Sequence, residues 1–387
     1  MSISFQDIIL ILGSVQGLLL AIMIIHKNNR NKANRILAFL VFSYSLFMLN
    51  LFLFNAGMLL KNPIWIISLD GLPLLFGPLH YLYAKFLSGR EMQFRWSQLL
   101  HFIPFLLFRL YFIDAYFVEK TTLIDAIKLM SDGKPVIFIV SGWVIALQGL
   151  FYMFLTLRLL RDYETGIRHL YSSIEKINLS WLRNITYMTL VVWIVVFIEN
   201  LLQTFGSDLL GVEAQLVGLL TAVFVYAMAY IGLSRSEIFM QMNTKAGLSE
   251  ESVKTTNYSS YANSKYHKSG LSEEKATYYK LQLQNLMQEE KPYHNSNLTL
   301  QDLSEKLNIS THNLSEVINT QLNQNFFDFV NSYRVEEVKQ KLAEPAYEHL
   351  KILAVAYDSG FNSKTSFNAI FKRMTGQTPS EFRKQNA

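Results

Sequence analysis

"GFNSKTSFNAIFKRMTGQTPSEFRK", residues 360–384, ends in a strong start signal for a helix. Thr378 can cap that helix, Pro379 stands at the first helical position, where proline is tolerated, and Glu381 can reach back to complete a capping box. Gly376, just before this signal, suits the end of a preceding helix. The stretch therefore predicts two helices that meet at a sharp turn.

The apolar residues on either side of the sequence DSGFNS predict a helix-turn-helix motif. They recur every three or four residues, as one face of a helix requires. An earlier stretch repeats this arrangement around the short turn NIS, so we predict two such motifs in tandem. In the first motif Leu300, Leu303 and Leu307 face Leu314, Val317 and Ile318; in the second Ile352, Leu353, Ala356 and Tyr357 face Phe367, Ile370 and Phe371.

A longer helix is predicted between the two motifs. Thr299 and Ser310 are start signals for the helices of the first motif, Asn325 starts the long helix, and Asn362 or Ser363 starts the second helix of the second motif. Apolar residues line one side of the long helix, which would then separate the motifs as a rigid strut. They are Phe326, Phe329, Val330, Tyr333, Val338 and Leu342.

The sequences "LTLQDLSEKLNISTHNLSEVINTQL" (residues 298–322) and "SGFNSKTSFNAIFKRMTGQTPSEFRK" (residues 359–384) resemble the DNA-binding domain of the AraC family of bacterial transcription regulators. The resemblance covers residues 280–385 and is specific across the second motif. It implies that one recognition helix from each motif enters the major groove, about one helical turn apart. The chain as a whole resembles membrane-anchored regulators of this family.

The resemblance implies that the second helix of each motif reads DNA bases with its outward face. Lys364 suits guanine, Asn319 or Asn368 suits adenine, and Glu316 can accept from cytosine, each with about 1–3 kcal/mol of discrimination. The alternative for any one of these residues is a solvated surface position. The base-facing residues are predicted to be His312, Ser315, Glu316, Asn319, Lys364, Thr365, Asn368 and Ala369.

The charge of this predicted domain is unusual for a DNA-binding protein. From Thr277 onward, twelve Lys and Arg oppose twelve Asp and Glu, whereas after Ser363 five basic residues oppose Glu381 alone. We therefore expect phosphate contacts on the second motif, modest affinity, and a homodimer on double-stranded promoter DNA, with RNA polymerase as a further candidate partner. The phosphate-binding residues are predicted to be Lys372, Arg373, Arg383 and Lys384.

The part of the chain before residue 234 is too apolar for an ordinary soluble domain. The 387 residues are 51% hydrophobic and 17% charged, with a mean hydropathy of +0.19. Apolar segments of about 18–25 residues can cross a hydrocarbon core of about 30 Å. We therefore predict an all-α protein with a seven-transmembrane helix bundle before the cytoplasmic domain. The segments are Ile8–Ile25, Ile36–Leu60, Ile64–Leu87, Leu99–Phe117, Val136–Leu157, Ile185–Phe205 and Leu209–Leu233.

The connections between these segments predict the orientation. Three alternate connections, residues 26–35, 85–98 and 158–184, hold twelve Lys and Arg, whereas the opposite ones hold four. Basic connections stay on the cytoplasmic side, so we predict a multi-pass protein of the bacterial inner membrane with its N-terminus outside. The predicted domains are a sensor domain (1–233), a cytoplasmic linker (234–276) and a DNA-binding domain (277–387).

Ionisable and amide side chains within the apolar segments are candidates for sensing a signal. Charges at such depth are costly and usually mark a ligand site or a coupling network. For Asp70 and Asp114, simple contact with water at the outer interface is the alternative. The candidate sensing residues are Glu199, Asn200, Arg109, Asp70 and Asp114.

Catalysis and metal binding have little support in the sequence. The chain has no cysteine, which excludes disulfides, cysteine nucleophiles and thiolate metal sites. It has no HExxH, GxSxG, Walker-type or dinucleotide-binding pattern. We expect neither an enzyme nor a cofactor.

These patterns together predict a transcription regulator that lies in the lipid bilayer. A small-molecule or envelope signal would shift the membrane helices, and the linker would convey that shift to the DNA-binding domain. One alternative is a membrane transporter or receptor whose helix-turn-helix domain serves only regulation or partner docking, although a single Pro/Gly-broken segment is weak support for a transporter. Release of the DNA-binding domain by proteolysis in the linker is another alternative.

Overall fold

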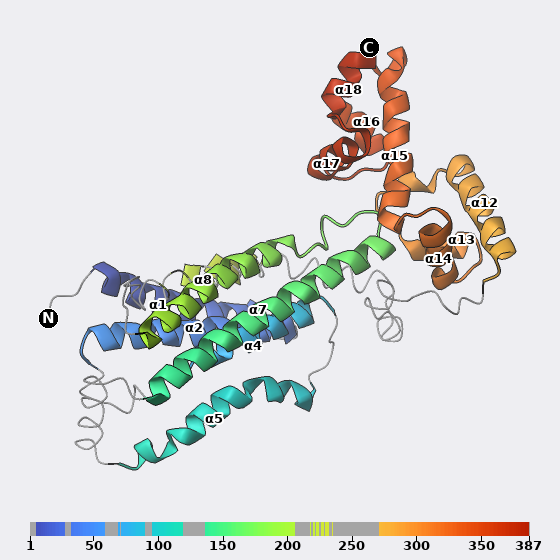
Figure 1. Ribbon diagram of the computed structural model, residues 1–387. Coiled ribbons are helices and arrows are strands. Elements are labelled where there is room, and N and C mark those ends of the chain that lie inside the picture. Colours follow the sequence, from blue (N-terminus) through green and yellow to red (C-terminus); the bar gives the residue numbers. More distant parts are fainter. Residues whose placement is uncertain are drawn as a thin grey trace. The chain divides into compact units, whose positions relative to one another are not determined.

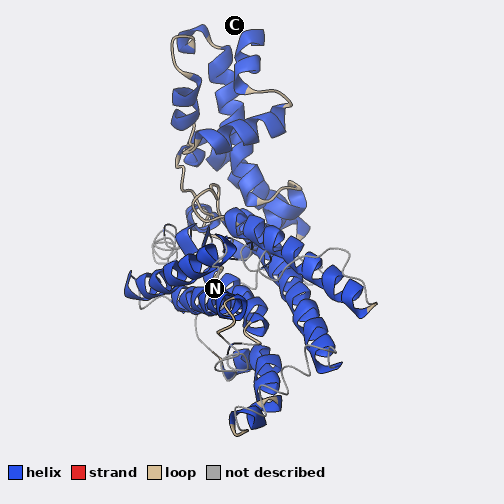
Figure 2. Cartoon of the chain, turned by 90° about the vertical axis from the view of Figure 1, so that its left-hand side faces the viewer, coloured by secondary structure: helices blue, strands red, loops and turns tan. Residues whose placement is uncertain are grey.

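The computed structural model describes residues 5–27, 32–58, 69, 71–89, 95–118, 136–205, some single residues between 217 and 234, and 271–386. Within these ranges the chain forms helices and loops without a strand, in agreement with the all-α prediction (Figure 2). The chain divides into two units. The N-terminal unit comprises Met1–Arg161 and Leu179–Leu248, and the C-terminal unit comprises Asp162–Asn178 and Ser249–Ala387.

Long apolar helices form the N-terminal unit. Four of them are long and apolar enough to cross a membrane, over Asp7–His26, Lys32–Asn55, Ile139–Leu170 and Ser180–Leu202. The elements are α1 (Phe5–Lys27), α2 (Lys32–Asn55), α4 (Pro73–Leu87), η2 (Trp96–Phe102), α5 (Ile103–Tyr111), η3 (Ile113–Tyr116), α7 (Val136–Leu170) and α8 (Ser180–Thr204) (Figure 1). The end of α7 belongs to the C-terminal unit.

Seven continuous spans are not found among the described residues. The segment 64–87 contains α4, a helix of 15 residues that begins at Pro73, and the segment 99–117 is divided among η2, α5 and η3. Proline lacks a backbone donor and therefore fits the first turn of a helix, so Pro73 and Pro104 start new helices inside these segments. The segment 209–233 lies mostly outside the described residues.

Large apolar side chains point outward along the long helices. On α7 the exposed residues recur at intervals of four, three, four and three, which is one face of a helix. Similar stripes run along α1 and α8. The stripe on α7 consists of Val140, Val144, Leu147, Phe151 and Phe154; that on α1 of Ile8, Leu12, Val15, Leu19 and Ile22; and that on α8 of Tyr187, Val191, Ile194, Ile198 and Leu201.

Small residues bring these helices close together on their inner sides. A Cβ atom at Gly17 of α1 would lie 2.1 Å from the Oγ atom of Ser45 of α2. A Cβ atom at Gly149 of α7 would lie 2.2 Å from the indole of Trp193 of α8. The hydroxyl of Ser14 also donates to the Ser45 carbonyl at 2.9 Å. Close packing of backbones through glycine, with buried hydroxyl hydrogen bonds, is typical of helices in membranes.

Nine short elements form the described part of the C-terminal unit after residue 270, and the expected start signals are confirmed. Thr299 and Asp302 form a capping box, Ser310 and Ser363 cap their helices, and Thr378 exchanges hydrogen bonds with Glu381. The elements are α12 (Glu273–Glu289), η4 (Pro292–His294), α13 (Leu300–Lys306), α14 (Thr311–Gln321), α15 (Phe326–Ala343), η5 (Pro345–Tyr347), α16 (Ile352–Asp358), α17 (Lys364–Thr375) and α18 (Pro379–Asn386). The first of them, α12, begins at Glu273, four residues before the expected domain start at 277.

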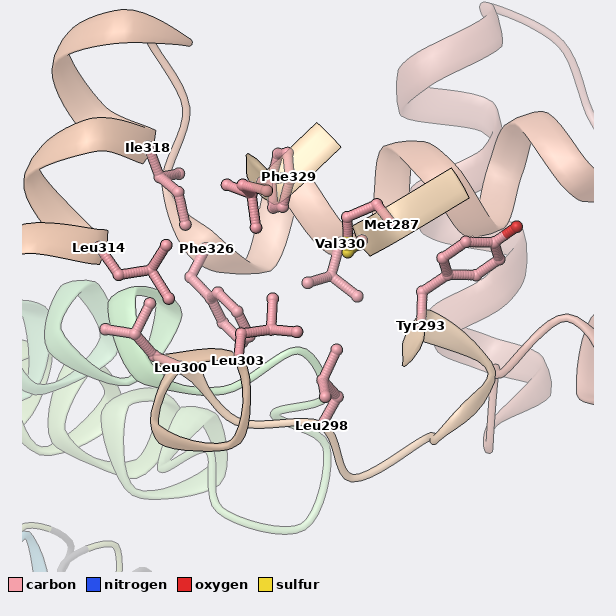
Figure 3. Packing of buried hydrophobic residues seen from close by; sticks show 11 residues of the cluster. Met287, Tyr293, Leu298, Leu300, Leu303, Leu314, Ile318, Phe326, Phe329 and Val330 are labelled. Carbon is pink, nitrogen blue, oxygen red and sulfur yellow. The ribbon is translucent and has the colours of Figure 1, made fainter. Parts of the chain in front are cut away.

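The helix α15 contributes to two separate hydrophobic cores. Its first turns place Phe326, Phe329 and Val330 in a core with α12, α13 and α14 (Figure 3). Its later turns place Val338 and Leu342 in a second core with α16 and α17. The helix therefore joins the two helix-turn-helix motifs, as the sequence predicted, but it uses different faces for the two cores.

Candidate nucleic-acid interface

One face of α17 carries polar side chains that the fold leaves uncovered. The Ser363 hydroxyl accepts the Ser366 amide and so fixes the start of the helix, while Phe367, Ile370 and Phe371 point into the second core. Ammonium, hydroxyl and amide groups on the outward face are the donors and acceptors that match base edges in the major groove. The exposed residues are Lys364, Thr365, Asn368, Ala369 and Lys372.

The four residues expected to bind phosphate fall into two pairs. Lys372 and Lys384 are exposed and form no ion pair with any described residue. Arg373 forms an ion pair with Asp328 at the start of α15. Arg383 is half-buried, and its guanidinium donates to the carbonyl of Leu350 at 2.8 Å. The two lysines are therefore available to a ligand, whereas both arginines are bound to the fold itself.

The recognition helix of the first motif, α14, is less accessible than the sequence predicted. His312 is exposed and Asn319 is half-buried, with its amide donating to the Ser315 hydroxyl at 3.2 Å. Ser315 and Glu316 are only 3% and 6% exposed, so the expectation that both side chains point into solvent is wrong. The reason is that α14 packs against α12 and α15 as well as α13, which covers more than one of its faces.

A buried carboxylate fastens α15 to the elements around it. Glu337 accepts hydrogen bonds from the Tyr293 hydroxyl at 2.7 Å and from His294 at 2.8 Å, and it pairs with Lys341 at 2.8 Å. Burial raises the pKa of the Glu337 carboxyl, but the hydrogen bonds from Lys341, Tyr293 and His294 outweigh burial and bring the pKa to about 2. Lys341 also pairs with Asp358 at the end of α16, so this network links η4, α15 and α16.

Arg334 is not among the residues predicted from the sequence to be buried or functional, although it is one of the largest fully buried side chains. Burial lowers the pKa of its guanidinium to about 10, well above neutrality, so the group stays charged. Its Nε atom donates to the Tyr293 carbonyl at 2.8 Å, and its Nη2 atom donates to the Asn295 carbonyl at 2.8 Å. The available signal was the spacing of Asn331, Arg334, Glu337 and Lys341, which places four polar residues along one strip of α15.

The candidate sensing residues lie in separate surroundings. Arg109 donates to the Tyr116 hydroxyl and its guanidinium lies over that ring, while Asp114 is exposed in η3. Asn200 donates to the Val196 carbonyl and packs closely on Gly142 of α7, and Glu199 beside it is half-buried. Asp70 lies outside the described residues. A sensory role for these side chains stays a prediction. Among the described residues, no cluster of three potential metal ligands occurs.

The C-terminal part of the chain is similar in sequence to known proteins. Residues 303–385 match the model of a helix-turn-helix domain family. An uncharacterized HTH-type transcriptional regulator of Staphylococcus aureus (strain COL) is 36% identical over 86 residues, which are 22% of this chain and 11% of that protein. A counterpart from strain MSSA476 gives the same values. A solved structure of a protein of unknown function from Listeria innocua covers 27% of this chain and 97% of its own, with 24% identity and a TM-score of 0.24.

The C-terminal unit therefore carries an AraC-type helix-turn-helix domain, and the chain is homologous to HTH-type transcriptional regulators over this part. The chain spans about a tenth of the length of the curated relatives it matches. The match begins at Leu303, inside α13, and ends within α18, so it contains both recognition helices. Over this part, the findings support a helix-turn-helix domain similar to those of transcriptional regulators.

Proposed function

We propose that this protein is a membrane-bound, sequence-specific transcription regulator that couples a signal at its N-terminal helices to promoter binding. The observation that carries the DNA-binding part is the outward face of α17, where Lys364, Thr365, Asn368 and Lys372 are exposed inside a matched helix-turn-helix domain. A recognition helix that presents such groups can enter the major groove. Of the other motif, His312 and Asn319 are the accessible candidates for base contact.

The outward apolar stripes support the membrane part of this proposal. Soluble proteins rarely expose contiguous apolar surface of this kind, whereas lipid favours it. Four helices have the length and composition to span a bilayer, and glycine contacts between neighbouring helices fit packing inside lipid. With the basic connections in the cytoplasm, the C-terminal unit lies on the side where DNA is.

The remaining parts of the proposal concern partners. The neutral DNA-binding domain makes single-site affinity modest, so a homodimer on two half-sites is the form that gives useful occupancy. Glu199, Asn200, Arg109, Asp70 and Asp114 are the candidate residues for sensing the signal. RNA polymerase is a further candidate partner at the promoter.

The decisive experiment is genome-wide crosslinking and immunoprecipitation of the intact protein beside a Lys364→Ala, Asn368→Ala double variant. We expect discrete promoter peaks that vanish in this variant, because both side chains lie on the exposed face of α17. The matched control is Lys275→Ala with Asn297→Ala, which removes the same two residue types from exposed positions of α12 and the loop before α13. We expect this control variant to give the same promoter peaks as the unaltered protein.

A flat profile from the unaltered protein, with normal amounts in the membrane, contradicts DNA binding and favours a transporter or docking role. Peaks that survive in the α17 variant would show that the residues that contact bases lie elsewhere in the C-terminal unit. Peaks carried only by a soluble fragment favour release of the domain by proteolysis instead of tethered binding.

A further inference from the structure

The connection between α7 and α8 is part of the C-terminal unit, together with the DNA-binding domain. The last turns of α7 and the residues up to Asn178 belong to this unit, although the earlier part of α7 and the whole of α8 belong to the N-terminal one. We propose that this connection, residues 171–178, docks on α15 and is the element through which the membrane helices act on the DNA-binding domain. This regulatory step rests on the proposed function, whereas the docking does not.

The docking centres on Ser172, which is 1% exposed. Its amide and its hydroxyl both donate to the Leu298 carbonyl, at 3.1 and 2.7 Å. Its own carbonyl accepts from Asn331 at 3.0 Å and from Arg334 at 3.1 Å. Its hydroxyl accepts a further hydrogen bond from Arg334 at 3.1 Å. Every hydrogen-bonding group of Ser172 is thus used by the DNA-binding domain.

The guanidinium of Arg334 needs this connection. Its Nη1 atom donates to the Ser172 carbonyl and to the Asn331 side chain, and its Nη2 atom donates to the Ser172 hydroxyl. Withdrawal of the connection therefore removes two acceptors of the guanidinium. A buried charge that loses acceptors is strongly destabilised unless water replaces them. The site therefore fits a turn that presents a carbonyl and a small hydroxyl, both of which are buried at Ser172.

Apolar and polar contacts extend the docking to both helix-turn-helix motifs. Leu170 packs against the first core, and Ile174 packs against the second core. The Arg168 guanidinium lies 5.4 Å from the ring centroid of Phe327. Ser173 contacts the side chain of Asn362 at 3.0 Å, directly before Ser363, the cap of α17. The connection therefore spans the strut between the two motifs and reaches the start of the second recognition helix.

This arrangement gives the membrane helices a short route to the DNA-binding domain. Leu170 ends α7 and Ser180 begins α8, so a shift of either helix must move α15 or break the Ser172 contacts. Contacts that are either made or broken are the kind of two-state element that coupling between sites requires. The sequence had suggested the linker 234–276 as the route, and the connection between α7 and α8 is shorter.

The test of docking uses the full chain in native membranes and the absence of natural cysteines. Ser173→Cys and Asn362→Cys are combined, a protease site is inserted between residues 250 and 260, and a short bismaleimide is added. We expect the two fragments to stay joined after cleavage in most molecules. Each single-cysteine variant is a control and leaves the fragments separate.

Two further variants test the packing. Adding Ile174→Asp to the cysteine pair is expected to abolish the crosslink, because a carboxylate replaces an apolar contact with the second core. Adding Lys176→Ala, a change at an exposed position of the same connection, leaves the yield unchanged. A crosslink no stronger than in the single-cysteine variants, or one formed only between two copies, overturns the docking.

Promoter occupancy then tests the coupling. Ile174→Asp without cysteines is expected to change occupancy severalfold, whereas Lys176→Ala has no effect. Unchanged occupancy in Ile174→Asp, together with a lost crosslink, overturns the regulatory role. If the unaltered protein occupies no promoter, the proposed function fails, and the crosslink still decides whether the connection docks.

Discussion

The two units of this chain differ in the kinds of side chain that they expose. In the N-terminal unit, leucine, valine and phenylalanine form exposed stripes, while Gly17, Ser14 and Ser45 lie at the contacts between helices. In the C-terminal unit, phenylalanine fills the cores and lysine lies on the surface. Water favours the second arrangement and lipid the first, so this contrast is the one that the proposed function requires.

The contrast extends to polar groups in the interior. Several buried hydroxyls of the N-terminal unit are satisfied within one helix, as with Thr156, Thr186 and Thr189, each of which donates to the carbonyl four residues earlier. The C-terminal unit instead buries charges, Arg334 and Glu337, in networks that link distant segments. Local hydrogen bonds hold single helices, whereas long-range networks fix helices relative to one another.

The largest effect is expected from Gly360→Ala in the C-terminal unit. Gly360 has φ +95°, and a Cβ atom there would lie 2.1 Å from the Tyr293 carbonyl oxygen and 2.9 Å from Arg334. Backbone strain and the clash together should cost about 3 kcal/mol or more. Hydrogen exchange of the full chain should show faster exchange across α15 and α17, with α1 and α2 unaffected.

Gly376→Ala is the matched control for this prediction. Gly376 also has a positive φ, +81°, but open space surrounds its Cβ position. Only the left-handed conformation is then disfavoured, which costs about 1 kcal/mol. Equal losses of protection from hydrogen exchange in the two variants would show that the clash with the Tyr293 carbonyl does not lower the stability of the fold.

The second effect probes close packing in the N-terminal unit. Gly17→Leu places a side chain where Ser45 and Tyr226 lie, which should cost about 2–3 kcal/mol through overpacking. The expected result is a lower temperature of heat-induced aggregation in detergent. Val15→Leu, at an exposed position two residues away, should leave that temperature unchanged. Similar losses in both variants would argue against a lipid-facing stripe on α1.

Local signals made much of the C-terminal unit predictable from sequence. The caps at Thr299, Ser310, Ser363 and Thr378 are confirmed because each depends on residues within three positions of one another. The phase of a short helix is harder to predict: α16 has only seven residues, and Tyr357, expected inside, is 47% exposed, whereas Val355 is buried. Two turns give too few residues to define a face.

Contacts between residues far apart in the sequence could not be predicted from local patterns. Ser172 and Arg334 are 162 positions apart and belong to no apolar repeat, so periodicity carries no signal for their pairing. Hydropathy likewise reported the composition of the segments 64–87 and 99–117 but not where helices begin within them. The prolines of the segment 64–87 did predict a break there, and α4 begins at Pro73, whereas the new helix at Pro104 was not predicted. Whether the outward residues of α17 read bases stays a prediction, because no DNA contact is tested by the fold.

A third effect, of about 2 kcal/mol, is expected from Glu337→Gln, which weakens the network around α15. The folded-state pKa of about 2 lies below the ordinary value of 4.5, so the ionised carboxylate stabilises the fold above pH 5. That stability is lost as the pH falls from about 5 toward 2. Exchange of α15 amides should be faster in the variant at pH 7, and the ratio between variant and unaltered protein should fall from pH 5 to pH 3 and approach one only near pH 2.

Both proteins are compared at the same pH, so the intrinsic exchange rate cancels. Glu336→Gln is the control, since the neighbouring Glu336 is exposed and pairs with Lys339 at the surface. Exposed pairs of this kind contribute at most about 1 kcal/mol. A ratio that does not change between pH 7 and pH 3 would show that the Glu337 carboxylate is not held ionised by its partners.

The smallest effect separates the two kinds of basic residue on α17. Lys372 is exposed and forms no ion pair with the described residues, whereas Arg373 pairs with Asp328. On operators found by immunoprecipitation, Lys372→Ala should weaken binding of all sequences alike and lower the slope of log affinity against log salt by about one. Arg373→Ala should change that slope less, because its charge is already balanced within the fold. Equal slopes for the two variants would mean that the Arg373–Asp328 pair opens on DNA, and both side chains would then belong to the phosphate-binding surface.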